Sequence, residues 1–300
     1  MAHPTDIITN ADVAVFQPLL WGDKVNEFLK KKLVMGNFFT NRSSEVAAGG
    51  RALYTPGTTE MAATAKTNGN AVTLSSPTET KKTLTIDQWY ETSFVIEDAE
   101  AAQVKHSYTL QERYAKNAGY TVAKTLDAAI AALFSGFSNV VGASTTGVFD
   151  SDIRKAIGLL EAANVDIDEC AMFFDSKVFW NHVMGLTNFT TSANAAVDGY
   201  TPITGRVGQI YGVPVYRSNN IAYVSSTTGR NNAIAHPDAI HFATSPLGAG
   251  SAGAHSGEMG VRIQSNYIPE YLGTMVTADV LYGVVENRDE AGVLFRTAAV

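Results

Sequence analysis

A threonine-rich stretch from residue 55 to residue 83 constrains the fold of this 300-residue chain more than any other feature. Most of the stretch consists of Thr, Ser, Ala, Asn and Lys. Its large apolar residues are Met61, Val72 and Leu74. Threonine favours β-strands, and Asn68-Gly69 near the middle is typical of a type I′ hairpin turn. The pattern therefore predicts a long two-stranded ribbon with almost no apolar face.

Two interpretations of this stretch are open at the level of sequence. A low-complexity loop without order has a similar Thr/Asn/Ser-rich composition. An ordered ribbon is the other interpretation, but an isolated two-stranded ribbon is marginally stable in water. If the ribbon is ordered, another surface must hold it, and that surface need not belong to the same chain.

The overall composition limits the class of protein. Apolar residues make up 45% of the chain and charged residues only 17%, whereas about a quarter is usual for soluble domains. A chain with so few charges is expected to cover much of its surface. The formal net charge of −7 is unlike the basic stripe of a dedicated nucleic-acid binder. The single Cys170 excludes an intrachain disulfide framework, and no apolar run approaches the roughly 18 residues of a membrane span.

Apolar periodicity predicts an α+β chain without a repeat. Residues spaced by three and four between 21 and 33 predict a short amphipathic helix in an N-terminal arm. A capping box at Thr109 to Glu112 opens a predicted helix that runs to about Phe134. A second helix is predicted around 153–165. Further predicted strands lie at 170–174, 208–216, 261–268, 275–285 and 293–295.

No motif has the context that a catalytic or ligand site needs. Gly248 to Gly253 matches Gly-x-Gly-x-x-Gly, but a strand pattern follows it, whereas a dinucleotide site needs a helix. His236 and His241 flank a Pro turn and lack the rest of a metal-ligand shell. Cys170 lies in an apolar run and is interpreted as a small buried hydrophobe. We therefore predict no catalytic residue, no cofactor, no metal and no enzyme activity.

Five strings follow one another in a specific order. They are the ribbon Gly49 to Asp87, Phe94-Val-Ile-Glu-Asp-Ala-Glu-Ala-Ala-Gln103 before the long helix, Leu160-Glu-Ala-Ala-Asn-Val165, Gly208-Gln-Ile-Tyr-Gly-Val-Pro-Val-Tyr-Arg-Ser-Asn219, and Thr277-Ala-Asp-Val-Leu-Tyr-Gly-Val-Val285. In this order they resemble a tailed-bacteriophage major capsid protein with the Hong Kong 97-type fold. The resemblance covers nearly the whole chain.

The resemblance implies a particular domain organisation. It assigns an N-terminal arm to 1–48 and an extended β-hairpin loop to 49–88. A peripheral domain would comprise 89–165 and 258–300, with a spine helix at about 107–135. An axial domain would comprise 166–257.

The resemblance also implies a function. The chain would be a coat protein that self-assembles into hexamers and pentamers of an icosahedral head, in the host cytoplasm, around double-stranded DNA that it does not bind sequence-specifically. Expected partners are further copies of the chain, a portal protein, a decoration protein and a separate scaffolding protein, since only about forty residues precede the ribbon. The alternative is an encapsulin-like cellular compartment, which shares the fold.

Contacts between subunits are expected in the arm and the ribbon. The candidate contact residues are Trp21, Phe28, Thr58, Met61, Lys66, Asn68, Gly69, Val72 and Leu74. An unsupported ribbon and an amphipathic arm are what a subunit needs if its neighbours complete its surfaces, and obligate interfaces of this kind typically bury more than about 2,000 Å².

Overall fold

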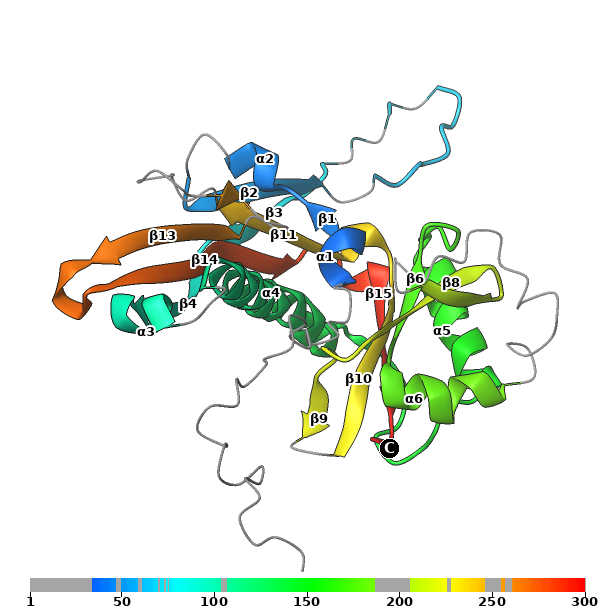
Figure 1. Cartoon of the computed structure of the whole chain (residues 1–300). Helices are drawn as coiled ribbons and strands as arrows, with labels where there is room; N and C mark the ends of the chain where they lie inside the picture. The colour runs from blue at the N-terminus through cyan, green and yellow to red at the C-terminus, as the bar shows by residue number, and fades with distance from the viewer. Residues whose placement is uncertain are drawn as a thin grey trace, which may run out of the picture. The chain divides into compact units, whose positions relative to one another are not determined.

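The computed structural model divides the chain into two units, Met1–Lys31 and Lys32–Val300, and the residues described belong to the second (Figure 1). The structure describes residues 34–46, 50–58, 61–69, 71–72, 74, 76–103, 107–186, 206–225, 228–245, 255–256 and 261–299. The predicted amphipathic helix of the arm, with Trp21 and Phe28, lies outside these residues.

The first of two large sheets is organised around one long strand, β14. Its six strands are β1 (Thr40–Asn41), β4 (Gln88–Glu97), β11 (Ile240–Ser245), β12 (His255–Ser256), β13 (Arg262–Ile268) and β14 (Gly273–Glu286). Strand β4 runs antiparallel to β14 along one side. On the other side, β13 pairs with the first half of β14 and β11 with the second half. Strand β1 adds to β11 in parallel, and β12 adds to β13.

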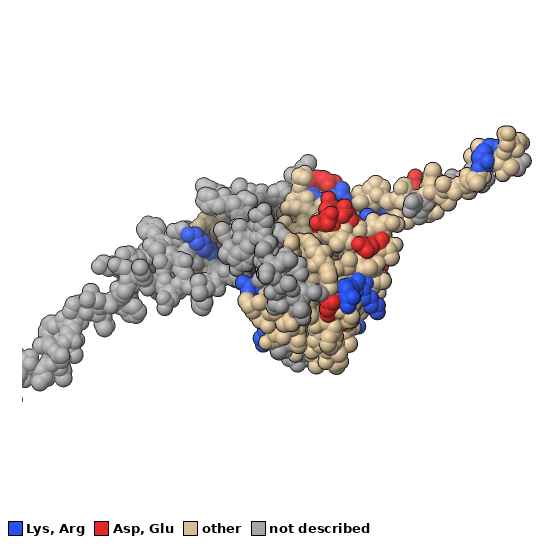
Figure 2. Space-filling view, turned by 90° about the vertical axis from the view of Figure 1, so that its right-hand side faces the viewer, with Lys and Arg blue, Asp and Glu red and all other residues tan. Residues whose placement is uncertain are grey.

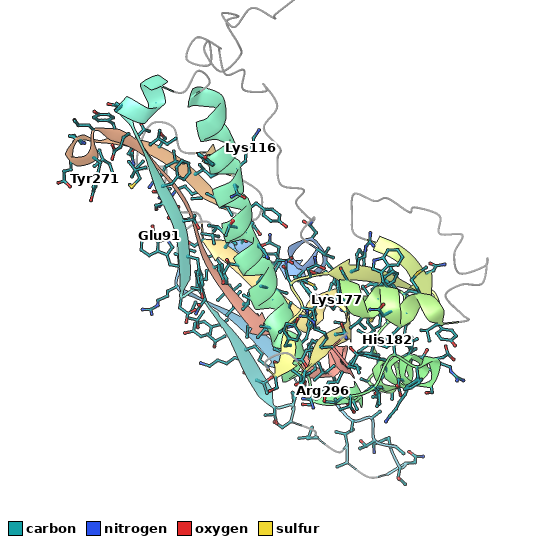
Figure 3. The ribbon with its side chains drawn as sticks, turned by 60° about the horizontal axis from the view of Figure 1, so that its bottom comes forward. Glu91, Lys116, Lys177, His182, Tyr271 and Arg296 are labelled. Carbon is teal, nitrogen blue, oxygen red and sulfur yellow. The ribbon has the colours of Figure 1, made fainter. Side chains whose placement is uncertain are left out.

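Helix α4 (Ser107–Ala132) packs on this sheet, where it lies along β4 and β14 (Figure 3). Its 26 residues extend over about 39 Å. The buried residues Ala118, Val122, Leu126 and Ile130 recur every four positions and form the apolar stripe that meets the sheet. The predicted long helix at about 107–135 is confirmed. It begins at Ser107, two residues before Thr109, where the predicted capping box would have opened it. A 3-10 turn, η1 (Leu133–Gly136), continues it.

The second sheet contains most of the remaining strands. They are β5 (Asn139–Gly142), β6 (Ala171–Asp175), β7 (Arg206–Ile210), β8 (Val213–Ser218), β9 (Tyr223–Ser225), β10 (Thr228–Ala235) and β15 (Gly292–Thr297). Helix α5 (Asp150–Ala162) contacts β5 and β15, and α6 (Ser176–Asn181) contacts β6 and β8. Strand β6 is buried along its whole length, which confirms the predicted buried strand at 170–174.

Aromatic side chains join the second sheet to the end of the long helix. Phe173 of β6 stacks on Phe39, with ring centroids 5.5 Å apart, and lies 5.8 Å from Phe134 of η1. Phe39 follows the short helix α1 (Met35–Phe38). All three rings are buried, so one core extends from the long helix into the second sheet.

The two sheets do not follow the predicted boundary between peripheral and axial residues. Strand β11 lies within 166–257 but pairs with β14 in the first sheet. Strands β5 and β15 lie outside that range but belong to the second sheet. The division into two domains stays a prediction, and the α+β fold class is confirmed.

The predicted ribbon is present at its base and is shorter than expected. Strands β2 (Ala52–Thr58) and β3 (Glu79–Thr85) pair antiparallel from Ala52–Thr85 to Thr58–Glu79. Beyond Thr58, the described residues form no strand until Glu79. Threonine propensity alone does not extend the ladder, because no apolar side chains pack across this part of the ribbon. We call the paired segment the hairpin root and residues 61–78 the hairpin tip.

The hairpin root packs on its own chain. Leu84 of β3 and Ile86, just beyond it, are buried against Val46 of helix α2 (Ser43–Val46) and Ala243 of β11. Leu53, Leu281 and Val285 line the same small core, which is separate from the main one. A side chain at Gly283 of β14 would overlap the carbonyl of Thr85, so glycine allows the root to lie directly on the sheet. The root is therefore held by a surface of its own chain, and the question of an outside surface concerns only the tip.

A buried carboxylate fixes the point where the described chain begins. Asp127 of α4 is fully buried, and its Oδ1 accepts the backbone N–H groups of Val34, Met35 and Gly36 at 3.2, 2.8 and 3.3 Å. Its Oδ2 accepts Nδ2 of Asn220 at 2.7 Å. Asp127 thereby supplies the cap that helix α1 lacks from its own residues.

Burial raises the pKa of Asp127 above its ordinary 3.8, while the hydrogen bonds oppose this shift. The folded protein then holds the proton more tightly than the unfolded chain. Stability that depends on this group therefore falls as the pH rises from 3.8 through the raised folded pKa.

We predict that Leu84→Ala lowers the free energy of unfolding by about 2–5 kcal/mol, because it leaves a cavity in the small core of the hairpin root. The matched control is Leu74→Ala in the hairpin tip, where the side chain is 89% exposed, and it should change stability by less than about 0.5 kcal/mol. Urea unfolding midpoints measure both. Equal effects of the two changes would contradict the distinction between root and tip.

We predict that Asp127→Ala destabilises the fold by about 1–3 kcal/mol, because buried N–H groups of α1 lose their acceptor. Asp127→Asn should cost less, since its amide oxygen still accepts them and Asn220 can turn its own oxygen toward the new amide. Urea unfolding at several pH values is the measurement. Relative to Asp127→Asn, the unchanged protein should lose stability as the pH rises above 3.8; a gain would contradict the assigned burial effect.

Candidate assembly surface

The hairpin tip is exposed at every described residue between 61 and 78. Its three large apolar side chains are in water: Met61 is 59% exposed, Val72 67% and Leu74 89%. Burying such a side chain typically stabilises a protein by about 1.5–3 kcal/mol. The described part of the chain provides no surface on which the tip gains this energy.

The tip has the composition of a surface that is covered in its working state. Lys66 is its one charged residue between 61 and 78, and its ammonium group donates to the carbonyl of Thr67 at 3.1 Å. The fully buried centre of a protein–protein interface is similarly depleted of charge. A turn is present at Asn68-Gly69, with Gly69 at φ +87°, a conformation that glycine adopts without strain. It is not the predicted type I′ hairpin turn, because the backbone of Asn68 does not have a positive φ and no described strand flanks the turn.

Seven of the nine predicted contact residues lie on the hairpin. Thr58 lies at the last pair of the hairpin root and is exposed. The six that follow lie along the exposed tip: Met61, Lys66, Asn68, Gly69, Val72 and Leu74. Trp21 and Phe28 fall outside the described residues. Contact of any of these residues with another subunit stays a prediction.

Strand β4 is a second exposed surface that the sequence analysis did not single out. Among the described strands it pairs with β14 alone, so its other edge presents unpaired backbone groups along ten residues. Trp89, Tyr90 and Val95 are 65%, 45% and 40% exposed. The signal in the sequence is that apolar residues occupy adjacent positions of one strand, which indicates that both faces of β4 are to be covered.

Trp89 is held in its exposed position by a polar contact. Its Nε1 donates to Oδ2 of Asp279 on β14 at 3.2 Å. The same carboxylate accepts two hydrogen bonds from Arg262 of β13, at 2.9 and 2.6 Å. Asp279 is buried beneath these two side chains. This contact links three strands and holds a large aromatic ring at the surface, where pre-positioned rings commonly anchor interfaces.

A third exposed apolar group lies at the turn between β13 and β14. Tyr267, Tyr271 and Leu272 are 53%, 59% and 66% exposed. Figure 3 shows Tyr271 at the end of this strand pair that is farther from Arg296 and His182, which lie beside the second sheet. Leu272 has a left-handed backbone at φ +43°, and its carbonyl accepts the N–H of Asp98 at 2.9 Å.

Charges are sparse and mixed on the face that Figure 2 presents. Among the residues coloured in Figure 2, a few acidic and a few basic side chains are scattered over a surface that is mostly uncharged. This arrangement differs from the continuous basic surface of a nucleic-acid binder.

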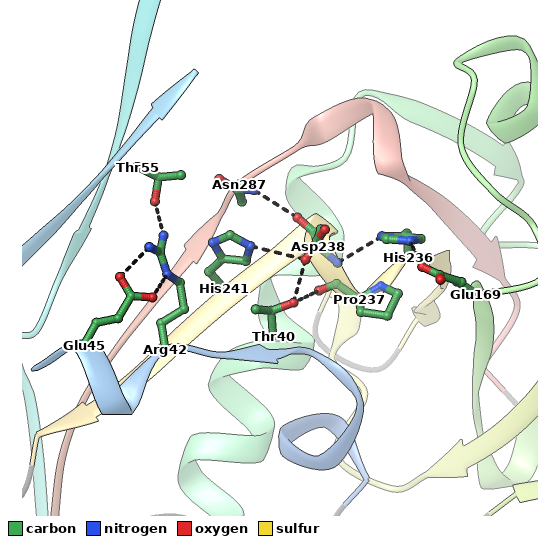
Figure 4. Close-up of polar contacts among 10 residues, drawn as sticks. All are labelled: Thr40, Arg42, Glu45, Thr55, Glu169, His236, Pro237, Asp238, His241 and Asn287. Carbon is green, nitrogen blue, oxygen red and sulfur yellow. Dashed lines mark hydrogen bonds and ion pairs between the residues drawn. The ribbon is translucent and has the colours of Figure 1, made fainter. Parts of the chain in front are cut away.

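The two side chains discussed as candidates for chemistry, His236 and Cys170, are either paired or buried within the fold. His236 pairs with Glu169 at 2.9 Å and accepts the N–H of Asp238 (Figure 4). Cys170 is fully buried, as predicted, and burial raises its pKa to about 12, so its thiol is not a ready nucleophile. The glycine motif at 248–253 lies outside the described residues.

The described part of the chain has neither a candidate metal-binding cluster nor a candidate membrane-spanning helix. It contains no cluster of three or more His, Cys, Asp or Glu side chains that could hold a metal ion. None of its helices combines the length and apolarity needed to cross a membrane.

Comparison with known proteins gives a result at the level of structure. No protein-family model matches the chain, and no curated protein matches its sequence. Solved phage structures match over nearly the whole chain. A chain of Mycobacterium phage Che8 is 20% identical, with a TM-score of 0.68 over 93% of this chain and 97% of that one.

Two capsid structures are similar at lower identity. A chain from the capsid of Cyanophage P-SCSP1u is 13% identical, with a TM-score of 0.71 over 100% of this chain and 99% of that one. A chain from the mature capsid of bacteriophage PhiM1 is 13% identical, with a TM-score of 0.70 over 99% and 96%. The resemblance predicted from the sequence strings is therefore confirmed in three dimensions: this chain has the fold of phage capsid chains.

Proposed function

We propose that this chain is the major capsid protein of a tailed bacteriophage. Copies of it assemble in the host cytoplasm, as hexamers and pentamers, into an icosahedral head around double-stranded DNA. The shared fold with phage capsid chains supports this proposal, and so does the distribution of exposed apolar surface.

The contrast between hairpin root and hairpin tip is the observation that carries the proposal. The root is rigidly packed through Leu84 and Ile86, while the tip leaves Leu74 almost fully in water. From Thr58 to Asn68 the chain can extend about 30 Å beyond the last strand pair. A fixed base with a projecting end that carries a single charge, at Lys66, is suited to reach a neighbouring copy.

The other exposed surfaces give each subunit further edges for assembly. Strand β4 offers an unpaired edge with Trp89 and Tyr90 on it, and the β13–β14 turn offers Tyr271 and Leu272. The net charge of −7 suits a wall that encloses DNA without gripping it, because phosphate binding depends on clustered Lys and Arg.

The finer organisation and the other partners are part of the same proposal. Residues 89–165 and 258–300 form the peripheral domain, with α4 as its spine, and 166–257 form the axial domain. A separate scaffolding protein guides assembly, a portal protein occupies one vertex, and a decoration protein binds the outer surface. The protein acts as a structural component and not as an enzyme.

Electron microscopy of the purified chain tests the proposal. The unchanged protein, expressed with or without a scaffolding protein, should form rings, tubes or closed shells. The double variant Met61→Asp, Leu74→Asp should remain folded but fail to assemble, because it places two charges in surfaces that a neighbour must cover. Its unfolding midpoint should match that of the unchanged protein.

The matched control keeps both positions apolar as Met61→Leu, Leu74→Met. This variant should assemble as the unchanged protein does, since the exchange conserves side-chain volume. Monomers of the unchanged protein under all conditions would contradict the proposed function. Normal shells from the aspartate variant would contradict the role of the hairpin tip.

A further inference from the structure

A buried histidine without hydrogen bonds lies beneath the hairpin root. His241 of β11 is 7% exposed, and neither Nδ1 nor Nε2 has a hydrogen-bond partner among the residues that the structure describes. Nε2 is 3.7 Å from Oδ1 of Asp238, which is too long for a hydrogen bond. Buried polar side-chain atoms nearly always have partners, so this ring requires an explanation.

The sheet register places His241 on the face that carries the hairpin root. His241 pairs with Val285, and Ala243 pairs with Gly283. Side chains two residues apart on a strand share a face, so the imidazole lies on the same face as Ala243. Ala243 and Val285 both belong to the small core that buries Leu84 and Ile86. A proton on His241 would therefore bring a charge to the edge of that core.

The charged groups that face His241 come from two sides. Arg42 and Glu45 belong to the segment that ends in α2, and Asp238 belongs to the turn η3 (Pro237–Ala239) before β11 (Figure 4). On neighbouring β14, Glu286 pairs with Ile240 and so lies on the opposite face. On neighbouring β1, the group paired with His241 is the uncharged Thr40.

Arg42 connects His241 to the hairpin. Its guanidinium group donates to both carboxylate oxygens of Glu45 at 2.6 Å and to the hydroxyl of Thr55 on β2. Its backbone N–H donates to the carbonyl of Phe242 at 2.8 Å. One residue thus ties the hairpin root to β11, directly beside the histidine.

Asp238 is poorly placed to compensate a charge on His241. Its Oδ1 already accepts the hydroxyl of Thr40 at 2.7 Å, and its side chain is 51% exposed. Solvent weakens the attraction between such a carboxylate and a buried cation.

Burial lowers the pKa of His241 below its ordinary 6.5, and the nearby Arg42 lowers it further, while Asp238 and Glu45 oppose the shift. The unfolded or opened chain then binds the proton more readily than the closed fold. Stability that depends on His241 is therefore complete above 6.5 and is lost as the pH falls through the folded pKa.

We infer that His241 is an acid-sensitive release for the hairpin root: protonation of its imidazole repels Arg42, brings a charge to the small core and frees β2 and β3 from the sheet. The inference concerns the single chain and does not depend on the proposed assembly. The hairpin root would be held closed at neutral pH and would open at mildly acidic pH, while the two large sheets stay folded.

Hydrogen exchange of the unassembled full-length chain, followed by mass spectrometry, tests this inference. Amide protection in 52–58 and 79–85 is compared between the unchanged protein and His241→Gln, at about one unit above and one unit below the ordinary histidine pKa of 6.5. Comparison at equal pH removes the intrinsic pH dependence of exchange. His236→Gln is the matched control, since His236 lies at the start of the η3 turn that precedes β11 but pairs with Glu169.

In the acidic sample the unchanged protein should lose protection relative to His241→Gln, by up to about tenfold for each unit by which the pKa is lowered. The loss should be confined to the hairpin root, and His236→Gln should behave as the unchanged protein does. An equal loss in His241→Gln, or no loss in the unchanged protein, would overturn the inference.

A second measurement needs no variant at the central position. The ring resonances of His241 in the unchanged protein, followed by NMR across the pH range, report its pKa directly. A value below 6.5, with hairpin resonances shifting at the same midpoint, supports the release. A value at or above 6.5 overturns it, even if His241→Gln does not fold.

Discussion

The burial of a few apolar side chains at the hairpin root is the constraint that positions the exposed hairpin tip. Leu84 and Ile86 bury themselves against α2 and β11, and this contact fixes the direction in which the hairpin leaves the sheet. The apolar packing is confined to the pairs nearest the sheet, at Leu53 and Leu84, while the strand pairing continues to Thr58 and Glu79. Past the last pair the described residues of the tip are all exposed, so the conformation of the tip depends on what it meets.

The frame that carries this hairpin is built for rigidity. Helix α4 packs along β4 and β14, and the aromatic rings near its end continue the core into the second sheet. Asp127, near the C-terminal end of the helix, accepts hydrogen bonds from the backbone N–H groups of Val34 and Met35, which fixes the chain where the arm joins the fold. A frame of this kind with projecting segments suits the proposed assembly of copies into a shell.

Much of the fold could be predicted from sequence because local patterns are strong. The apolar four-residue spacing of α4, the continuous apolar run of β6 and the Asn68-Gly69 turn are signals within a few residues. Sheet membership could not be predicted in the same way. Whether β11 pairs with β14 or with β10 depends on packing between residues far apart in the chain. From the sequence alone, β11 is assigned to the same domain as the strands that precede it.

The candidate surface was predictable only in part for a related reason. The hairpin tip stands out by composition, because residues 61–78 contain only three large apolar residues and one charged residue. Trp89 and Tyr90 resemble ordinary core residues of a strand, and only the structure reveals that β4 is an edge. The orphaned ring of His241 leaves no trace in sequence, since its significance arises from register with Val285 and from the proximity of Arg42.

Hydrogen exchange across residues 61–78, compared between free subunits and assembled particles, tests the central claim most directly. If neighbouring copies complete the hairpin tip, its amides should exchange rapidly in the free chain and become strongly protected in the particle, while the hairpin root is protected in both. Equal exchange of the tip in the two states would contradict the account.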